Sequence, residues 1–338
     1  MIIIRNKLKG IIPYQLVYWP TETTLKELAE NLPFSHYARV AFASTDLEHG
    51  RCIITHTLSL TLLIDLRRPL GAIYKDLIEN ARIRIHKAEK LGGRLMIRRY
   101  SGGPDVDGLV PQFVKLYNDF ARGKPLQTSP VSEAREYSYF PNADLMMAYL
   151  DGQPICGHLN LVDRDVGIVR LHDSANRRFD DPATARLAGI VNVYLHWYEL
   201  EKYRDEGLTT YDFGSLGQVE DSIGVNRFKM QFGGTIIREH NYLLAGAPTV
   251  WRLAFTLMSH TKRWQRRIQM ERAGERWRNM SLEEIRQTIK DSIAAYERQL
   301  QARRQANTSD LRPAARVSSE TVSRGAIDLK HGKASQHV

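Results

Sequence analysis

The sequence predicts an α/β protein built on a mixed sheet with helices on both faces. Stretches that alternate apolar and polar residues, as half-buried strands do, lie on both sides of a long helix expected over 182–203. Before that helix, three predicted strands joined by tight turns form a meander; after it come a strand, a short helix and a last strand. This order differs from the regular strand–helix alternation of a parallel sheet, so it favours parallel and antiparallel neighbours together.

The first hundred residues contain short strands and one long helix. Apolar side chains recur every three or four residues between positions 69 and 91, which is the spacing of one helix face, and Gly92-Gly93 is suited to end that helix. A shorter amphipathic helix is expected over 24–31. Strands are expected over 1–4, 36–45, 51–60, 62–66 and 94–100.

The second half begins after residues 101–107 (SGGPDVD), which lack an apolar period and form the best internal boundary. We expect a helix over 109–122 and polar loops over 123–135 and 173–181. Asp181 is suited to cap the long helix because its carboxylate can accept the first free amides of the helix. The remaining strands are expected over 144–150, 155–162, 166–172, 209–213 and 236–244.

These elements divide the chain into four predicted parts. Residues 1–104 form an N-terminal lobe, and residues 105–247 form a second, fuller lobe. Residues 248–305 begin apolar and continue as a charged, basic helix. Residues 306–338 are polar and rich in serine and arginine, so we expect disorder there.

Composition favours an intracellular protein. Of 338 residues, 43% are hydrophobic and 25% charged, as in ordinary globular domains. Cys52 and Cys156 lie in apolar, strand-like runs, so they are expected as buried free thiols of a reducing compartment. The opening MIIIRNKLKG has too short an apolar run for a secretory signal, and no run of 18 apolar residues occurs. We expect a cytoplasmic protein.

The net charge of +10 is concentrated near the C-terminus. Residues 259–338 hold 17 Lys and Arg against 9 Asp and Glu, whereas the rest holds 31 against 29. Between Arg263 and Arg278, arginines alternate with Trp264 and Trp277, a composition open to three interpretations. The segment contacts the anionic inner face of a cell membrane, or it contacts tRNA, or it is a charged helix with a solvated outer face.

The stretch from Tyr211 to Gly234 (YDFGSLGQVEDSIGVNRFKMQFGG) is the first candidate for chemistry. It is predicted as a strand, a glycine-broken loop and a short helix, and active sites in α/β sheets gather where strands end. Asp212 at the strand end is a candidate base or orienting carboxylate for an amine. The structural alternative is a turn in which its side chain accepts a nearby backbone amide.

The order of elements resembles the core of the GNAT N-acyltransferase superfamily. Two local sequences are similar to the Fem family of non-ribosomal peptidyl transferases and their acetyltransferase-like relatives: YDFG followed by GVNRFKMQFGG, and the helix ARIRIHKAEKLG over 81–92. The resemblance covers about 62–244. It implies two GNAT-like lobes, the first incomplete, and transfer of an acyl group to an amine.

The resemblance also implies roles for single residues. The family's Phe-Lys pair matches Phe228 and Lys229, which would hold the acyl donor and the charge that develops at the reacting carbonyl. A surface lysine whose stem covers the sheet edge is the alternative for Lys229. Arg177 and Arg178 stand where GNAT enzymes bind the CoA pyrophosphate, but the usual glycine-rich loop is missing, and Asp180-Asp181 would repel phosphate.

Four further residues are candidates for substrate contact. His172 and Ser174 follow a predicted strand and are candidates to line an acceptor site, although adjacent residues do not make a catalytic triad. Arg84 and Lys87 lie on a basic helix face that is suited to the phosphates of a nucleotide-linked or lipid-linked precursor, or is simply solvated. No motif indicates a metal, flavin or nicotinamide site.

The expected function is an N-acyltransferase without a tightly bound cofactor or a covalent enzyme intermediate. The acceptor would be an amine on a carbohydrate or cell-envelope precursor, in polysaccharide or peptidoglycan assembly. Acyl-CoA is the favoured donor, and aminoacyl-tRNA is the alternative. A third hypothesis is a non-catalytic GNAT-like module that binds a glycan or a lipid-linked sugar.

Overall fold

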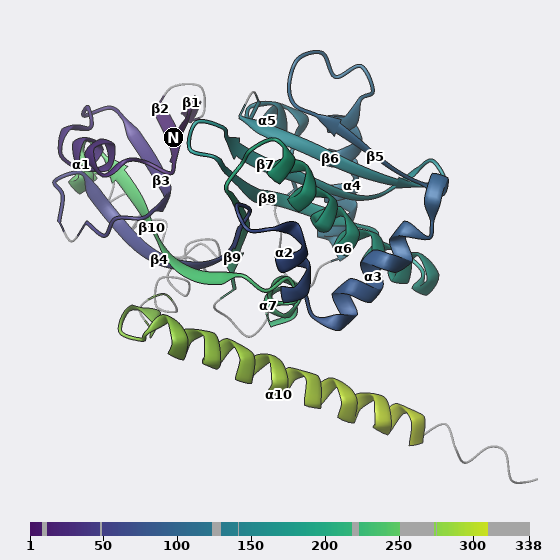
Figure 1. Cartoon of the computed structure of the whole chain (residues 1–338). Helices are drawn as coiled ribbons and strands as arrows, with labels where there is room; N and C mark the ends of the chain where they lie inside the picture. Colours follow the sequence, from purple (N-terminus) through teal and green to yellow (C-terminus); the bar gives the residue numbers. More distant parts are fainter. Residues whose placement is uncertain are drawn as a thin grey trace, which may run out of the picture. The chain divides into compact units, whose positions relative to one another are not determined.

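The computed structural model describes most of the chain (Figure 1). The described residues are 1–8, 12–47, 49–123, 130–140, 142–217, 223–250, 274 and 276–309; for 6–8, 12 and 303–309 only the backbone is described. Residues 1–293 form one compact unit, and the described part of a second unit, 294–309, continues the last helix.

A ten-stranded mixed sheet is the framework of the first unit, as predicted. Its strand order is β1-β2-β3-β10-β4-β9-β8-β7-β6-β5. The pairs β2–β3 and β8–β9 are parallel, and the other neighbours are antiparallel. The strands are β1 Ile2–Leu8, β2 Ile12–Tyr18, β3 Tyr37–Ala43, β4 Ile53–Asp65, β5 Leu95–Tyr100, β6 Ala143–Leu150, β7 Gln153–Asp163, β8 Ile168–Asn176, β9 Thr210–Leu216 and β10 Thr235–Ala245.

Helices cover both faces of the β6–β8 part of the sheet. Alternate residues of β6 divide between two cores: Met146 and Ala148 pack with α2, α3 and α6, whereas Leu145 and Met147 pack with α4. Both faces are apolar, which explains why all of β6 is buried. The helices are α1 Glu22–Asn31, α2 Leu70–Asp76, α3 Glu79–Glu89, α4 Leu109–Gly123, α5 Glu133–Tyr137, α6 Pro182–Asp205, α7 Ile223–Met230 and α10 Leu282–Ser309.

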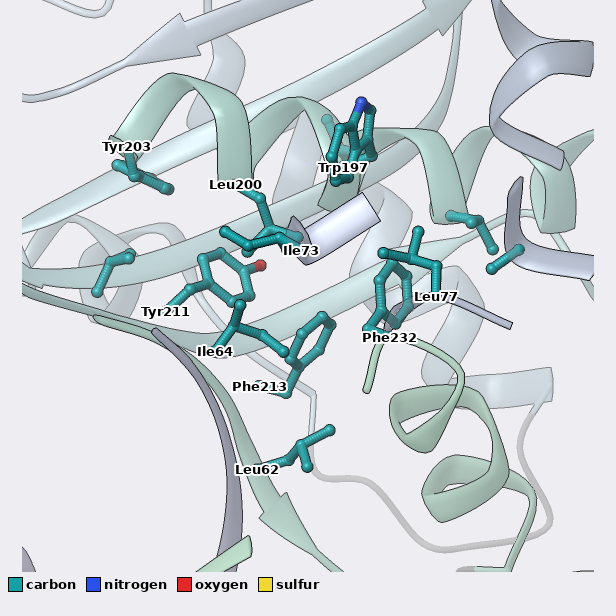
Figure 2. Packing of buried hydrophobic residues seen from close by; sticks show 14 of the residues in the cluster. Leu62, Ile64, Ile73, Leu77, Trp197, Leu200, Tyr203, Tyr211, Phe213 and Phe232 are labelled. Atoms are coloured by element: carbon teal, nitrogen blue, oxygen red, sulfur yellow. The ribbon is translucent and has the colours of Figure 1, made fainter. Parts of the chain in front are cut away.

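Aromatic side chains pack the larger core around the stretch from Tyr211 to Gly234, the first candidate for chemistry. Figure 2 shows Tyr211 and Phe213 of β9 beside Phe232, with Leu62 and Ile64 of β4 and with Trp197 and Leu200 of α6 around them. The Phe213 and Phe232 rings lie 4.7 Å apart. This packing fixes β9 and the C-terminal end of α7 on one rigid base.

Two predicted strands, 51–60 and 62–66, form the single strand β4, so the predicted break was wrong. Thr61 at the expected break is fully buried and stays in the ladder, opposite Ile237 and Ser215. Its hydroxyl donates a hydrogen bond to Asp212, which satisfies the polar group inside the sheet.

The helix predicted over 69–91 is divided into α2 and α3. Leu77 and Ile78 are extended, and the Ile78 amide donates to the Gln231 carbonyl at 3.0 Å. Gly233 comes so close that a Cβ there would lie 2.9 Å from the Asp76 Cβ. The turn after α7 therefore interrupts the helix, a long-range contact that periodicity does not reveal.

Strand β2, Ile12–Tyr18, was not predicted, and the other elements differ from the predictions mainly in length. The predicted loop over 173–181 begins as strand, because β8 stays paired with β7 as far as Asn176. The predicted loop over 123–135 includes the start of α5. Asp181 caps α6 as expected: its Oδ1 accepts from the Ala183 amide at 2.9 Å and the Thr184 amide at 3.0 Å. Cys52 and Cys156 are buried free thiols.

The boundary near residue 104 stays a prediction. One sheet runs across it, since β5 pairs with β6 along its whole length. The described part of the C-terminal region contributes Trp277, Ile285 and Ile289 to the larger core of the first unit. Residues 306–309 belong to α10, and the rest of the predicted tail lies outside the described residues. No helix in the described part of the chain is both long and apolar enough to cross a bilayer.

Candidate active site

The strands β8 and β9 separate in the middle of the sheet. Their parallel ladder covers Ile168–Arg170 and Thr210–Asp212 and goes no further among the described residues. Beyond it, β8 stays with β7 and β9 stays with β4. We call the point where β8 and β9 separate the fork; beyond it their facing edges have no partner strand among the described residues.

Asp212 fixes the backbone at the fork through hydrogen bonds to both of its carboxylate oxygens. It is fully buried; its Oδ1 accepts from the Thr61 hydroxyl and from the Gly214 amide at 2.7 Å. The Arg170 guanidinium donates to Oδ2. Bonds to both oxygens fit an anchor that shapes the turn, which is the structural alternative considered from the sequence. The predicted role as a base stays untested.

Arg170 links two buried carboxylates. Besides Asp212, its Nη1 donates to Glu239 Oε1 at 2.6 Å, and its Nη2 donates to the Ser215 hydroxyl at 3.2 Å. Burial raises the pKa of Glu239 to about 7, although the Arg170 charge opposes the shift. Arg170 and Glu239 were not predicted from the sequence, because both stand in strands that carry several other polar residues.

Lys229 reaches the fork from α7. Its half-buried side chain donates from Nζ to the Ser215 carbonyl at 2.8 Å. Gly214 has φ +74°, and a Cβ there would lie 3.7 Å from Lys229 Nζ and 2.9 Å from the Leu171 carbonyl, so only glycine fits. Burial first, and then the Arg170 charge, lower the pKa of Lys229 to about 7. Asp212 and Lys229, both predicted from the sequence, meet at the same turn.

Phe228 points into the core instead. Its ring lies 5.4 Å from the His196 ring and 5.6 Å from the Phe232 ring. It therefore fixes α7, and with it the origin of the Lys229 side chain. Its predicted contact with the acyl donor stays a prediction.

A buried hydrogen-bond network joins α6 to β7 and β9. The Tyr211 hydroxyl donates to Glu199 Oε2 at 2.6 Å and lies 2.9 Å from His196 Nδ1. His158 Nδ1 lies 3.0 Å from the same carboxylate oxygen, and its Nε2 lies 3.1 Å from Asn192 Oδ1. These hydrogen bonds link α6 to β7 and β9, and only His196 Nε2 among the ring nitrogens of the two histidines lacks a partner within the described residues.

His172 occupies a bulge of β8 next to the fork. The β7–β8 register shifts at this position, and its ring packs against Tyr139 at 4.6 Å and Tyr18 at 6.3 Å. Its Nε2 is buried without a hydrogen-bond partner among the described residues. Burial lowers the pKa of His172 to about 4, so the ring is neutral at pH 7. Ser174 lies further along the strand, opposite His158.

Buried acidic groups lie beyond His172. Glu136 on α5 is fully buried, and neither of its carboxylate oxygens has a hydrogen-bond partner in the described part of the chain. Arg135 Nη1 lies 3.3 Å from Glu136 Oε1, and its Nη2 donates to Asp173 Oδ2 at 3.0 Å. Burial, with a smaller effect of Asp173, raises the pKa of Glu136 to about 7. Arg135 and Glu136 were not predicted from the sequence as site residues.

Two aromatic residues from the N-terminal strands have strained backbones near Arg170. Trp19 has φ +49° and Phe42 has φ +64°, a conformation that bulky L-residues rarely adopt. The Arg170 guanidinium lies 3.4 Å above the centre of the Phe42 ring, and the Trp19 ring is 5.8 Å from that ring. Such strain concentrates at functional sites. The N-terminal strands thus contribute an aromatic wall to the fork.

Replacing Glu136 with glutamine is expected to make stability less dependent on pH. The folded-state pKa lies above the ordinary value, so the folded protein binds the extra proton, and stability falls as pH rises from about 4.5 to about 7. Relative to wild type, Glu136→Gln should gain about 1–3 kcal/mol between pH 5 and pH 8 in urea unfolding. Glu133→Gln, an exposed change on the same helix, is the control. Parallel stability curves for Glu136→Gln and wild type would contradict the assignment.

The start of α6 is occupied by the chain itself. Asp181 takes the first amides of the helix, and Arg177 Nε donates to Asp180 Oδ2 at 2.8 Å. The Arg178 guanidinium stacks over Phe179 at 4.8 Å. The amides that a pyrophosphate would use are therefore already bonded, in agreement with the missing glycine-rich loop. Binding of substrate by Arg177 and Arg178 stays a prediction.

A basic groove of about 330 Å³ separates α3 from the first turns of α6. Arg84 in this groove is half-buried, whereas Lys87 and Arg186 are exposed; within the described residues none of the three forms an ion pair. Burial, and then Arg227, lower the pKa of Arg84. The structure thus adds Arg186 to the two predicted cations. The lining residues are Asn80, Ile83, Arg84, Lys87, Ala185, Arg186, Gly189 and Ile190.

Comparison with known proteins identifies the domain that contains the fork. Residues 76–230 match the acetyltransferase (GNAT) domain family, a range that includes Arg170, Asp212 and Lys229. Residues 76–230 are thus an acyltransferase domain of the GNAT type, as the resemblance implied. Comparison with curated proteins found no match.

Several solved structures are similar to this chain at low sequence identity. The C-terminal domain of a putative lysylphosphatidylglycerol synthetase from Agrobacterium fabrum is 11% identical, with a TM-score of 0.45 over 73% of this chain and 82% of that one. FemX is 13% identical, with a TM-score of 0.44 over 57% and 63%. L-PGS from Bacillus licheniformis is 10% identical, with a TM-score of 0.45 over 71% and 81%.

Proposed function

We propose that the chain transfers an acyl group from an activated donor, with acyl-CoA favoured, to an amine on a carbohydrate or cell-envelope precursor. The observation that carries the proposal is Lys229 beside Gly214 at the fork, where the lysine ammonium binds the Ser215 carbonyl at the edge along which β8 and β9 separate. The amine nitrogen attacks the acyl carbonyl carbon, the bond to the carrier sulfur breaks, and the amine proton leaves with the thiol or to solvent. Transfer is direct.

Lys229 stabilises the negative charge on the carbonyl oxygen in this mechanism. A cation in a site poor in water interacts with that charge more strongly than in bulk solvent. Asp212 and Arg170 act through position, because they fix the turn that carries Gly214 and Ser215. Cys156 is not a nucleophile: it is fully buried, its thiol donates to the Ala188 carbonyl, and burial raises its pKa.

The groove between α3 and α6 is proposed to hold the phosphates of the donor or of the precursor. Unpaired guanidinium and ammonium groups are the usual partners of phosphate oxygens. The half-buried Arg84, close to a second arginine, gains most from an anion because burial without a partner is costly. We place the phosphates in this groove and not at the start of α6, because Asp181 already binds the amides there.

Thermal-shift titration tests the donor. With acyl-CoA as donor, acetyl-CoA and longer acyl-CoAs should raise the unfolding temperature of the full chain, and the variant with Arg84→Ser and Lys87→Ser should bind them about tenfold or more weakly. Lys26→Ser, which removes an exposed ammonium on α1, is the control. Undiminished acyl-CoA binding by the double variant would contradict the groove assignment.

Aminoacyl-tRNA remains the second candidate donor, on the ground of the basic C-terminal region. Removal of 310–338 should then weaken binding of charged tRNA, and activity should fall steeply with salt. A deletion from Lys262 is unsuitable, because Trp277 and Ile285 are in the core. For the same reason Trp277 cannot also contact a membrane or RNA; Trp264 lies outside the described residues.

Absence of turnover with either donor, with glycan binding unaffected by Lys229→Ala, would favour the non-catalytic module.

A further inference from the structure

We propose that His56, His240 and Asp46 form a binding site for one divalent transition-metal ion, with Zn²⁺ as the expected ion. The three residues come from β4, β10 and the connection between β3 and β4. Two imidazoles and one carboxylate are a donor set that suits zinc and neighbouring metals, whereas magnesium and calcium prefer oxygen ligands alone.

The distances between the donor atoms fit a metal ion. His56 Nε2 lies 2.9 Å from His240 Nδ1, and Asp46 Oδ1 lies 3.5 Å from each of these nitrogens. A circle through three such atoms has a radius of about 1.9 Å, so a point roughly 2.0–2.1 Å from all three exists just off their plane; these are the Zn–N and Zn–O bond lengths.

Neighbouring groups hold the ligands in place. The Tyr242 hydroxyl accepts from the Leu47 amide at 2.7 Å and donates to the Thr45 carbonyl at 3.0 Å, so it fixes the residues on both sides of Asp46. The Tyr242 ring also stacks on His56, with centroids 4.5 Å apart and planes 8° from parallel. Ligands oriented by such outer contacts bind metals more tightly.

The contacts that the three side chains already make still allow an ion to bind. His56 and His240 can share one hydrogen, but Asp46 Oδ1 lies at 3.5 Å, too far for a good hydrogen bond to either ring. Arg278 Nη1 approaches the other oxygen, Oδ2, at 3.8 Å, which leaves Oδ1 for a cation. The other histidine–carboxylate group differs because both oxygens of the Glu199 carboxylate already take part in short hydrogen bonds.

The site would fasten the sheet next to the candidate active site. His240 follows Glu239, the carboxylate that Arg170 holds, and His56 is on the strand that carries Thr61. A metal bound here would join the β3–β4 connection to β4 and β10. Its role is therefore structural, and the acyl-transfer chemistry does not use it.

Zinc titration of the tag-free full chain tests the proposal. We expect one equivalent of Zn²⁺ to bind and to raise the unfolding temperature, and Co²⁺ to give the visible absorption of a site with nitrogen ligands. His56→Phe keeps the stack on Tyr242 but cannot ligate, and Asp46→Asn keeps the shape of the side chain. Each should weaken Zn²⁺ affinity by more than about tenfold. His86→Ala, an exposed imidazole beside Glu89, is the control.

Two results would overturn the proposal. One is the absence of stoichiometric Zn²⁺ and Co²⁺ binding by the folded wild-type chain. The other is binding that His56→Phe and Asp46→Asn leave unchanged, which would place the ion elsewhere. Circular dichroism of the metal-free variants shows whether they are folded, so loss of binding is distinguished from loss of structure; the second variant keeps the test valid if the first does not fold.

Discussion

Replacing Lys229 with alanine lowers the rate of acyl transfer by about 10²–10³-fold, the usual cost of removing one group that stabilises an oxyanion. The fold should persist, because the side chain is only half-buried and its hydrogen bond goes to the Ser215 carbonyl. Release of free thiol from acyl-CoA, or loss of the aminoacyl group from tRNA, measures the rate. Donor affinity should change far less than the rate constant, because the charge develops in the transition state.

The matched control for this variant is Lys26→Ala, which removes an ammonium from the exposed pair with Glu22. It should retain full activity. If Lys229→Ala and Lys26→Ala are equally active, the fork does not use Lys229, and the proposed mechanism fails.

The pH profile separates two roles for Lys229. Its pKa is lowered to about 7, so the cation predominates below that pH and the neutral amine above it. If the cation stabilises the oxyanion, the rate constant at saturating substrate should fall as pH rises through about 7. A rate that rises over the same range would instead assign the neutral amine as a base. Lys229→Ala should lack this transition in either case.

Replacing Arg170 with methionine should destabilise the protein by roughly 3–5 kcal/mol, because Asp212 and Glu239 would be left buried without a cation. Urea unfolding at pH 7.5 measures the loss. The destabilisation should diminish toward pH 5, since protonation relieves the unpaired carboxylates. Activity should fall as well, because the turn that carries Gly214 depends on Asp212.

Arg94→Met provides the comparison for an exposed pair. Arg94 binds Asp151 with two hydrogen bonds at the surface, and its removal should cost less than about 1 kcal/mol. If Arg170→Met unfolds at the same urea concentration as Arg94→Met, the buried network does not stabilise the fork.

Local patterns in the sequence predicted much of the fold. The meander, the long helix capped by Asp181 and the strand–helix–strand that follows it are all present. The failures were at long-range contacts. The break between α2 and α3 depends on the Gln231 carbonyl, and the continuity of β4 through Thr61 depends on a hydrogen bond to Asp212.

The same division applies to the sites. The resemblance directed attention to Lys229 and Asp212, which the fold brings to one turn. It gave no indication of Glu136 or of the strained Phe42, and no spacing of ligands suggested a metal. His56 and His240 are separated by 184 positions and become neighbours only where β4 pairs with β10.

The sequence by itself determined the class of fold, the family of the domain over 76–230 and the turn where chemistry is expected, because periodicity, caps and short motifs act over a few residues. Only the tertiary structure decided what surrounds that turn. Strand pairing sets which side chains are buried together, and burial sets the pKa values of Lys229, Glu239 and Glu136. Desolvation and charge act through space between residues that are distant along the chain, so they become visible only once the sheet is assembled.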